Sequence, residues 1–138
     1  MDVLFLIGRI LFGMLFVSSG LTAHMGRQGV EYARMYKAPA PELLVPASGA
    51  AIVIGGLLVT LGIWADLGAL ILGAFVAAIA PIMHAFWKEE DAQTRAIQQS
   101  QFMKNVALAG AALILFYAYN QLQGDAGLSI TDPLFNRG

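Results

Sequence analysis

Residues 43–84 read LLVPASGAAIVIGGLLVTLGIWADLGALILGAFVAAIAPIMH, which is two long apolar runs separated by a few residues around Trp64. A helix needs about 20 mainly apolar residues to cross the hydrocarbon core of a bilayer. Both runs approach that length, although the second is shorter and carries Pro81 near its far end. The short separation predicts an antiparallel helical hairpin that turns at Trp64, Ala65 and Asp66. This stretch therefore indicates a membrane protein built from α-helices.

Two further apolar runs flank the hairpin. The run before it contains one charge, Arg9, and the run after it has Lys104 in its first turn. We therefore predict an all-α fold, an integral membrane bundle of four transmembrane helices that forms a single domain over residues 1–138. The expected spans are residues 3–23, 43–63, 67–84 and 102–122. The other expected segments are a short interfacial helix within 30–37, a polar loop at 88–101 with a helical turn or two, and an extramembrane tail at 124–138.

The composition agrees with burial in lipid. Of the 138 residues, 58% are hydrophobic and only 12% are charged, whereas about a quarter of the residues in an average soluble domain are charged. The lipid bilayer is therefore the first expected partner. The net charge of −1 gives no long-range field that would attract nucleic acid. The chain has no cysteine, which excludes disulfides, thiolate metal sites and iron–sulfur ligation within it.

The aromatic and basic residues fall at two levels of the predicted bundle. We name the side that holds both termini side A and the opposite side side B. Trp and Tyr favour the two membrane interfaces, and the threading puts Trp64, Tyr117 and Tyr119 at side A and Tyr32, Tyr36 and Trp87 at side B. Side A holds only the basic residues Arg9 and Arg137, whereas side B holds Arg27, Arg34, Lys37, Lys88, Arg95 and Lys104.

The positive-inside rule then places side B in the cytoplasm and both termini outside. The alternative is that the side B basic residues serve a site rather than topology. In either case we expect a multi-pass protein of the cell membrane, the bacterial inner membrane.

Small residues recur at spacings that bring them onto one face of each span. Such stripes let helix backbones approach closely in lipid, where water does not drive helices together. The pairs and ridges are Gly13 with Gly20, Gly49 with Gly56, Gly55 with Gly62, Ala69 with Gly73 and Ala77, and Ala107 with Ala111. They predict a compact bundle.

A group of polar and aromatic residues gathers at side B in this threading: His24, His84, Trp87, Lys104 and Asn105. A kink at Pro81 would open a pocket beside it. The pocket could bind a quinone carbonyl or a lipid phosphate, or each residue could simply be interfacial. Haem is disfavoured, because the chain has one pair of histidines, at the membrane edge, without a supporting motif.

Arg9 is the one charge well inside the first span. It either reaches back to the side A interface or contacts an anion or lipid headgroup within the bundle. No carboxylate lies at mid-membrane depth, which disfavours proton-coupled transport. No metal-binding cluster, phosphate loop, or nucleophile paired with a base is present either. The sequence therefore favours a non-catalytic protein and assigns no catalytic residue.

Four stretches resemble the DoxX family of small four-span membrane proteins. They are GRILFGMLFVSSGL at 8–21, HAFW at 84–87, FMKNVALAGAALIL at 102–115 and GDAGLSITDPL at 124–134, in the expected order over nearly the whole chain. The Lys104–Asn105 pair in its apolar setting is the most specific part. The positions that carry the resemblance are Arg9, Gly13, Gly20, His84, Phe86, Trp87, Lys104 and Asn105.

The resemblance implies a family whose biochemical function is mostly unknown. Some members are linked to membrane-associated oxidoreductase complexes, one of them with a superoxide dismutase and a sulfurtransferase. DoxD-type subunits belong to a thiosulfate:quinone oxidoreductase, and distant relatives act as cargo receptors. This chain departs from the family at 22–24, where Thr22, Ala23 and His24 replace a frequent lysine, and at 51–54, where a frequent glutamate is missing.

Three functional classes follow. The leading hypothesis is an accessory or anchoring subunit of a larger membrane complex, a redox or respiratory one as the resemblance implies. The second is a quinone-linked oxidoreductase subunit with a headgroup site near His84 and Lys104. The third is a small transporter or lipid carrier. Protein partners are expected under the leading hypothesis, and a homo-oligomer remains open.

Overall fold

The structure, a computed structural model, describes residues 2–122 and 128–135. Within those ranges the chain is helical and has no strand. The elements, in chain order, are α1 (Asp2–Ala23), α2 (Arg27–Met35), α3 (Pro41–Leu61), α4 (Ala65–Met83), the 3₁₀ turn η1 (Phe86–Lys88) and α5 (Ala92–Leu122).

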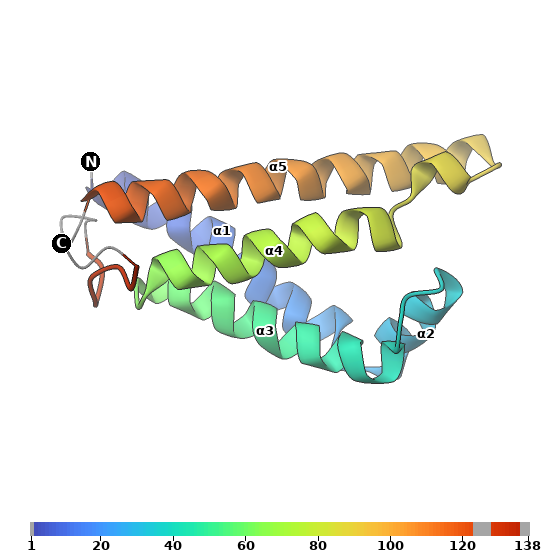
Figure 1. The fold of residues 1–138 in the computed structure, drawn as a ribbon, viewed down its shortest axis with the longest axis horizontal. Helices are drawn as coiled ribbons and strands as arrows, with labels where there is room; N and C mark the ends of the chain where they lie inside the picture. Colours follow the sequence, from blue (N-terminus) through green and yellow to red (C-terminus); the bar gives the residue numbers. More distant parts are fainter. Residues whose placement is uncertain (1, 123–127, 136–138) are drawn as a thin grey trace.

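Four of the described helices, α1, α3, α4 and α5, are long and apolar enough to cross a membrane. They run lengthwise beside one another, and α2 lies at the end of the bundle opposite the α3–α4 turn (Figure 1). The main packing contacts run from α1 to α3, from α3 to α4 and from α4 to α5. The predicted all-α membrane bundle is confirmed.

The contact between α1 and α3 depends on paired glycines. A Cβ atom built on Gly13 would lie 2.6 Å from the carbonyl oxygen of Gly56, and one built on Gly20 would lie 2.8 Å from that of Gly49. Real Cβ atoms do not approach so closely, so only glycine lets the two backbones meet here. Between α3 and α4, Gly68 likewise approaches the carbonyl oxygen of Gly55. The contacts between α1 and α3 lie on the predicted glycine pairs, whereas Gly68 belongs to none of them.

The hairpin turn lies slightly earlier than the sequence predicted. Gly62 ends α3 with a left-handed backbone, φ +69°, which is the usual conformation at a helix C-terminus. Trp64 also has a positive φ, +42°, and α4 begins at Ala65. Ala65 and Asp66 therefore belong to the first turn of α4 rather than to the loop, and both are buried.

The predicted polar segment at 88–101 is more helical than the turn or two expected, because residues 92–101 form nearly three turns at the start of α5. Asp91 caps this helix: its Oδ2 accepts the Thr94 N–H at 2.7 Å, and hydrogen bonds from Thr94 lower the pKa of the Asp91 carboxyl. The 31 residues of α5 are about 46 Å long at 1.5 Å per residue. The helix therefore extends beyond a hydrocarbon core of about 30 Å.

One stripe of α5 faces the bundle. Its buried residues are seven apart: Gln98, Asn105, Ala112 and Tyr119. A Cβ built on Gly73 of α4 would lie 3.1 Å from that of Ala112. Most of the remaining surface of α5 is exposed, and three of the four stripe residues are polar.

The glycine contact between α1 and α3 gives a first prediction. Gly13→Ala places a methyl group against the Gly56 carbonyl, and such overpacking costs typically about 1–3 kcal/mol. We expect a lower thermal unfolding midpoint in detergent. Gly8→Ala is the matched control on the same helix, because nothing lies within 4 Å of its Cβ position. Equal midpoints for the two variants would contradict the close contact.

Candidate functional site

Arg9 is the most deeply buried charge of the first helix, with 1% of its surface exposed. Its guanidinium donates to Ser129 Oγ at 2.6 Å, to the Leu128 carbonyl at 2.9 Å and to the Tyr119 hydroxyl at 3.3 Å. Arg9 therefore points toward side A, but its guanidinium is buried beneath the chain's own C-terminal segment. Its NH₂ groups bind that segment and α5.

Asp66 holds the same segment from α4. It is fully buried, and its two carboxylate oxygens accept the backbone N–H groups of Leu134 and Phe135 at 3.0 and 2.8 Å. The Gly62 carbonyl accepts the N–H groups of Ile130 and Thr131, both at 3.0 Å. Residues 128–135 are thus fastened over the side A end of the bundle. We name this set of contacts the tail clamp.

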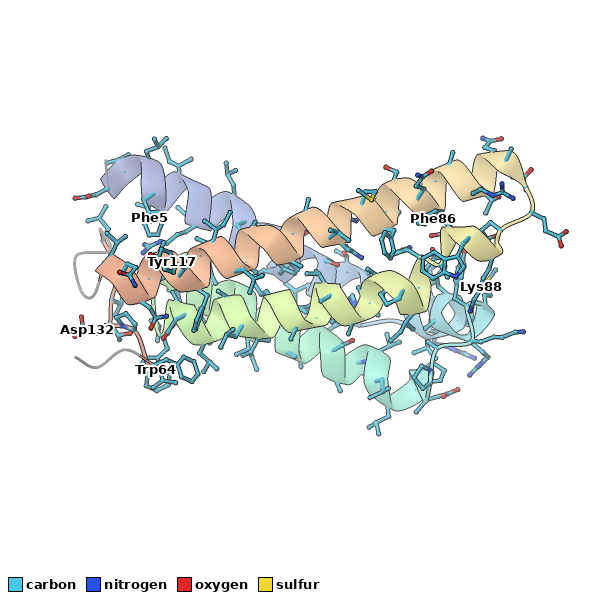
Figure 2. The ribbon with its side chains drawn as sticks, turned by 45° about the horizontal axis from the view of Figure 1, so that its top comes forward. Phe5, Trp64, Phe86, Lys88, Tyr117 and Asp132 are labelled. Atoms are coloured by element: carbon cyan, nitrogen blue, oxygen red, sulfur yellow. The ribbon has the colours of Figure 1, made fainter. Side chains whose placement is uncertain are left out.

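Sequence reasoning missed most of the tail clamp. Asp66 was assigned to a turn, and Tyr119 was assigned to the side A aromatic belt, whereas it is 2% exposed and accepts from Arg9. Trp64 and Tyr117 are exposed and lie at that end of the bundle (Figure 2). The signal for Tyr119 in the sequence is that Asn105, Ala112 and Tyr119 follow one another at seven-residue intervals.

A second polar network lies at side B, where three elements meet. His84, just after α4, has its Nδ1 2.7 Å from Gln98 Oε1 of α5. Gln98 Nε2 in turn donates to the hydroxyl of Tyr36, which follows α2. Because the Gln98 oxygen accepts in this arrangement, His84 Nδ1 carries the proton. Gln98 is 3% exposed, so its amide is the buried centre of the network.

The network joins three elements through their side chains. Burial, followed by the neighbouring Tyr32, raises the pKa of Tyr36, so its hydroxyl stays protonated at neutral pH. The Tyr32 and Tyr36 rings also pack together with centroids 4.9 Å apart. Sequence reasoning selected His84 but missed Gln98, which it placed in a loop.

Trp87 belongs to an aromatic cluster beside this network. Phe86, Trp87 and Phe102 contact one another edge to face, with centroids between 5.2 and 5.6 Å apart. Phe86 and Lys88 lie at the opposite end of the molecule from Trp64 (Figure 2). Trp87 remains 54% exposed, as an interfacial residue would be.

Lys104 and Asn105 are neighbours in sequence but face different ways. Lys104 is exposed and donates to Gln101 on its own helix. Six residues turn a helix by about 600°, so Lys104 is well away from the Gln98 face. Asn105 lies on that face and is 5% exposed. Among the described residues, the fully buried side-chain atoms without a hydrogen-bond partner are Arg9 Nε and Thr60 Oγ1.

His24 is not brought to His84. Its ring packs edge to face on Phe75 at 5.8 Å, and its Nδ1 lies 3.1 Å from the Ser19 carbonyl oxygen. Phe75 precedes His84 by nine residues, which is roughly 13 Å along α4. The predicted five-residue group therefore separates into His84 with the aromatic cluster, a buried Asn105, an outward Lys104 and a deeper His24.

The described residues hold no group of three His, Cys, Asp or Glu side chains that could bind a metal ion. Two of the described buried side chains, Arg9 and Asp66, carry a group that can ionise at neutral pH. Both bind residues 128–135 of the chain itself. Together with the four apolar helices, these features define a small helical integral membrane protein whose buried polar groups stabilise its fold.

The chain belongs to the DoxX family. The DoxX family model matches residues 4–85, which include α1 to α4 and the positions Arg9, Gly13, Gly20 and His84. Phe86, Trp87, Lys104 and Asn105 follow the matched range. Comparison with curated proteins and with solved structures finds no match.

The tail clamp gives a second prediction. Arg9→Gln removes charged hydrogen bonds that are worth roughly 1.5–3 kcal/mol each, so residues 128–135 should detach from side A. Because the chain has no cysteine, a spin label on Ile130→Cys reports this directly. We expect the label to be restrained in the parent protein and mobile in Arg9→Gln. Arg95→Gln is the control, since Arg95 binds the Glu89 carbonyl at side B. An equally restrained label in Arg9→Gln would contradict the clamp.

The side B network gives a third prediction. Gln98→Leu leaves both His84 and Tyr36 without their partner, and an unsatisfied buried group costs about 1–3 kcal/mol. We expect faster amide hydrogen exchange over residues 92–101 and a lower unfolding midpoint. The adjacent Gln99, which is exposed, supplies the control Gln99→Leu. The network has no stabilising role if the two variants behave alike.

Proposed function

We propose that this DoxX-family protein is a non-catalytic accessory or anchoring subunit of a larger membrane complex, a redox one as the family's associations suggest. The observation that carries the proposal is the use of its buried polar groups. Arg9 and Asp66 bind the tail, and His84 and Gln98 bind each other and Tyr36. These groups join elements of the fold and leave little free chemistry for turnover.

The surface that supports a partner is the side B end of α5. Its first three turns extend beyond the span, and Ile97 is 55% exposed there among polar neighbours. Trp87 is exposed on the adjacent η1 turn. We propose that this surface faces the cytoplasm. In support, Arg9 is an internal group, so the basic residues available to interact with lipid or solvent lie mostly at side B.

A photo-crosslinking amino acid at position 97 tests the proposal in native membranes. We expect adducts with one defined set of protein subunits, which should also co-purify in mild detergent. Position 114 is the comparison, because Ile114 is 70% exposed on the same helix but lies within the span. Adducts only with lipid or with a second copy of this chain at position 97, and no co-purifying subunit, would contradict an accessory role.

Asn105 favours the second candidate, a quinone-linked subunit. Its buried amide could donate to a quinone carbonyl, and it lies two turns from Gln98 on the same face of α5. Lys104 would not share that site. Stoichiometric quinone in the purified protein that is lost in Asn105→Leu would favour this function over the accessory one.

A further inference from the structure

An open groove of about 580 Å³ lies where α1 ends, α2 follows and α3 begins. Its wall includes the first two turns of α2 and the first two turns of α3. The groove lies at the side B ends of α1 and α3, and His24 is among the residues that line it. It is separate from the His84 network, whose residues do not line it.

The groove walls are held in place by two contacts. A Cβ built on Gly29 of α2 would lie 2.1 Å from the Ala23 carbonyl oxygen, so α2 packs directly on the end of α1. Across the groove, Arg34 of α2 forms an ion pair with Glu42 of α3. The cavity is thus bounded by fixed elements and not by a loose loop.

Two further charged residues line the groove without forming such an ion pair. Arg27 and Glu31 both line it, and neither forms an ion pair with another described residue. They are four residues apart on α2, which places them on one face with Cβ atoms about 5–6 Å apart. The groove therefore offers a free guanidinium and a free carboxylate side by side.

The start of α2 adds a second group that suits an anion. Its N-cap residue is Gly26, which supplies no side-chain acceptor to the first N–H groups of the helix. Unpaired N–H groups at a helix N-terminus attract phosphate, and the adjacent Arg27 guanidinium can bind phosphate oxygens in bidentate fashion. The part of the groove that would bind an anion is thus at Gly26 and Arg27.

We propose that the groove binds one phospholipid with a phosphoethanolamine headgroup. The phosphate lies at Gly26 and Arg27, and the primary ammonium donates to the Glu31 carboxylate. A choline headgroup carries no N–H donor for Glu31, and a glycerol headgroup carries no positive charge for it. The N–H donors of the ammonium thus select ethanolamine over choline, and its positive charge selects it over glycerol.

The apolar part of the groove suits the start of the acyl chains. Val30 and Pro46 line it, and two leucines close to its lining residues in the chain are exposed, Leu21 on α1 and Leu44 on α3. The headgroup thus lies at the interface while the chains follow the outer surface of the bundle.

The test uses the full chain, delipidated in detergent and titrated by native mass spectrometry with three phospholipids of identical acyl chains. Their headgroups are ethanolamine, choline and glycerol. We expect one ethanolamine lipid per chain, bound about tenfold more tightly than the other two. Arg27→Gln should weaken all three, whereas Glu31→Gln should abolish only the preference for ethanolamine over choline.

Two controls keep the test specific. Lys37→Gln and Glu90→Gln remove exposed charges outside the groove and should leave the preference unchanged. All four substituted side chains are exposed, so an unchanged unfolding midpoint is expected throughout. Equal binding of the three lipids, a preference for the glycerol headgroup, or an ethanolamine preference that survives Glu31→Gln would overturn the proposal.

Discussion

The buried guanidinium of Arg9 is the interaction on which this bundle most depends. A charge inside a membrane segment is costly unless it is paired, and three acceptors from α5 and the tail meet it here. The main helix contacts run in chain order, from α1 to α3, α4 and α5. Arg9 therefore joins the first helix to the last and to the segment that follows it. Asp66 fastens the same segment to the start of α4, so one buried cation and one buried anion close side A.

Side B is held by a side-chain hydrogen-bond network instead. Gln98 bridges His84 and Tyr36, which brings the end of α4, the start of α5 and the end of α2 to one point. This network lets α5 continue as a helix beyond the span without separating from its neighbours. Two polar residues of the family motif, Arg9 and His84, thus join elements of the fold, and Asn105 lies buried on the same face of α5 as Gln98.

Much of the fold could be predicted from the sequence, because apolar length and glycine spacing are local properties. Each is visible within a single span and needs no knowledge of residues far away in the chain. The site was harder. Arg9 looked like an interfacial residue, since its partner Ser129 is 120 residues away in the chain. Only a turn or two of helix could be expected within residues 92–101, because a polar helix outside the membrane has no apolar periodicity to mark it. His24 and His84 each end a predicted span and were expected at one depth, but apolar length does not determine how deep a helix ends.

The most direct test of a scaffold role is turnover per assembled complex in native membranes. His84→Asn and Asn105→Leu would each be introduced, and quinone-dependent electron transfer would be divided by the measured amount of intact complex. A scaffold predicts that any loss of activity follows loss of the complex, so that turnover per complex stays unchanged. A fall of tenfold or more in turnover at normal abundance would contradict it and would place one of these side chains in the reaction.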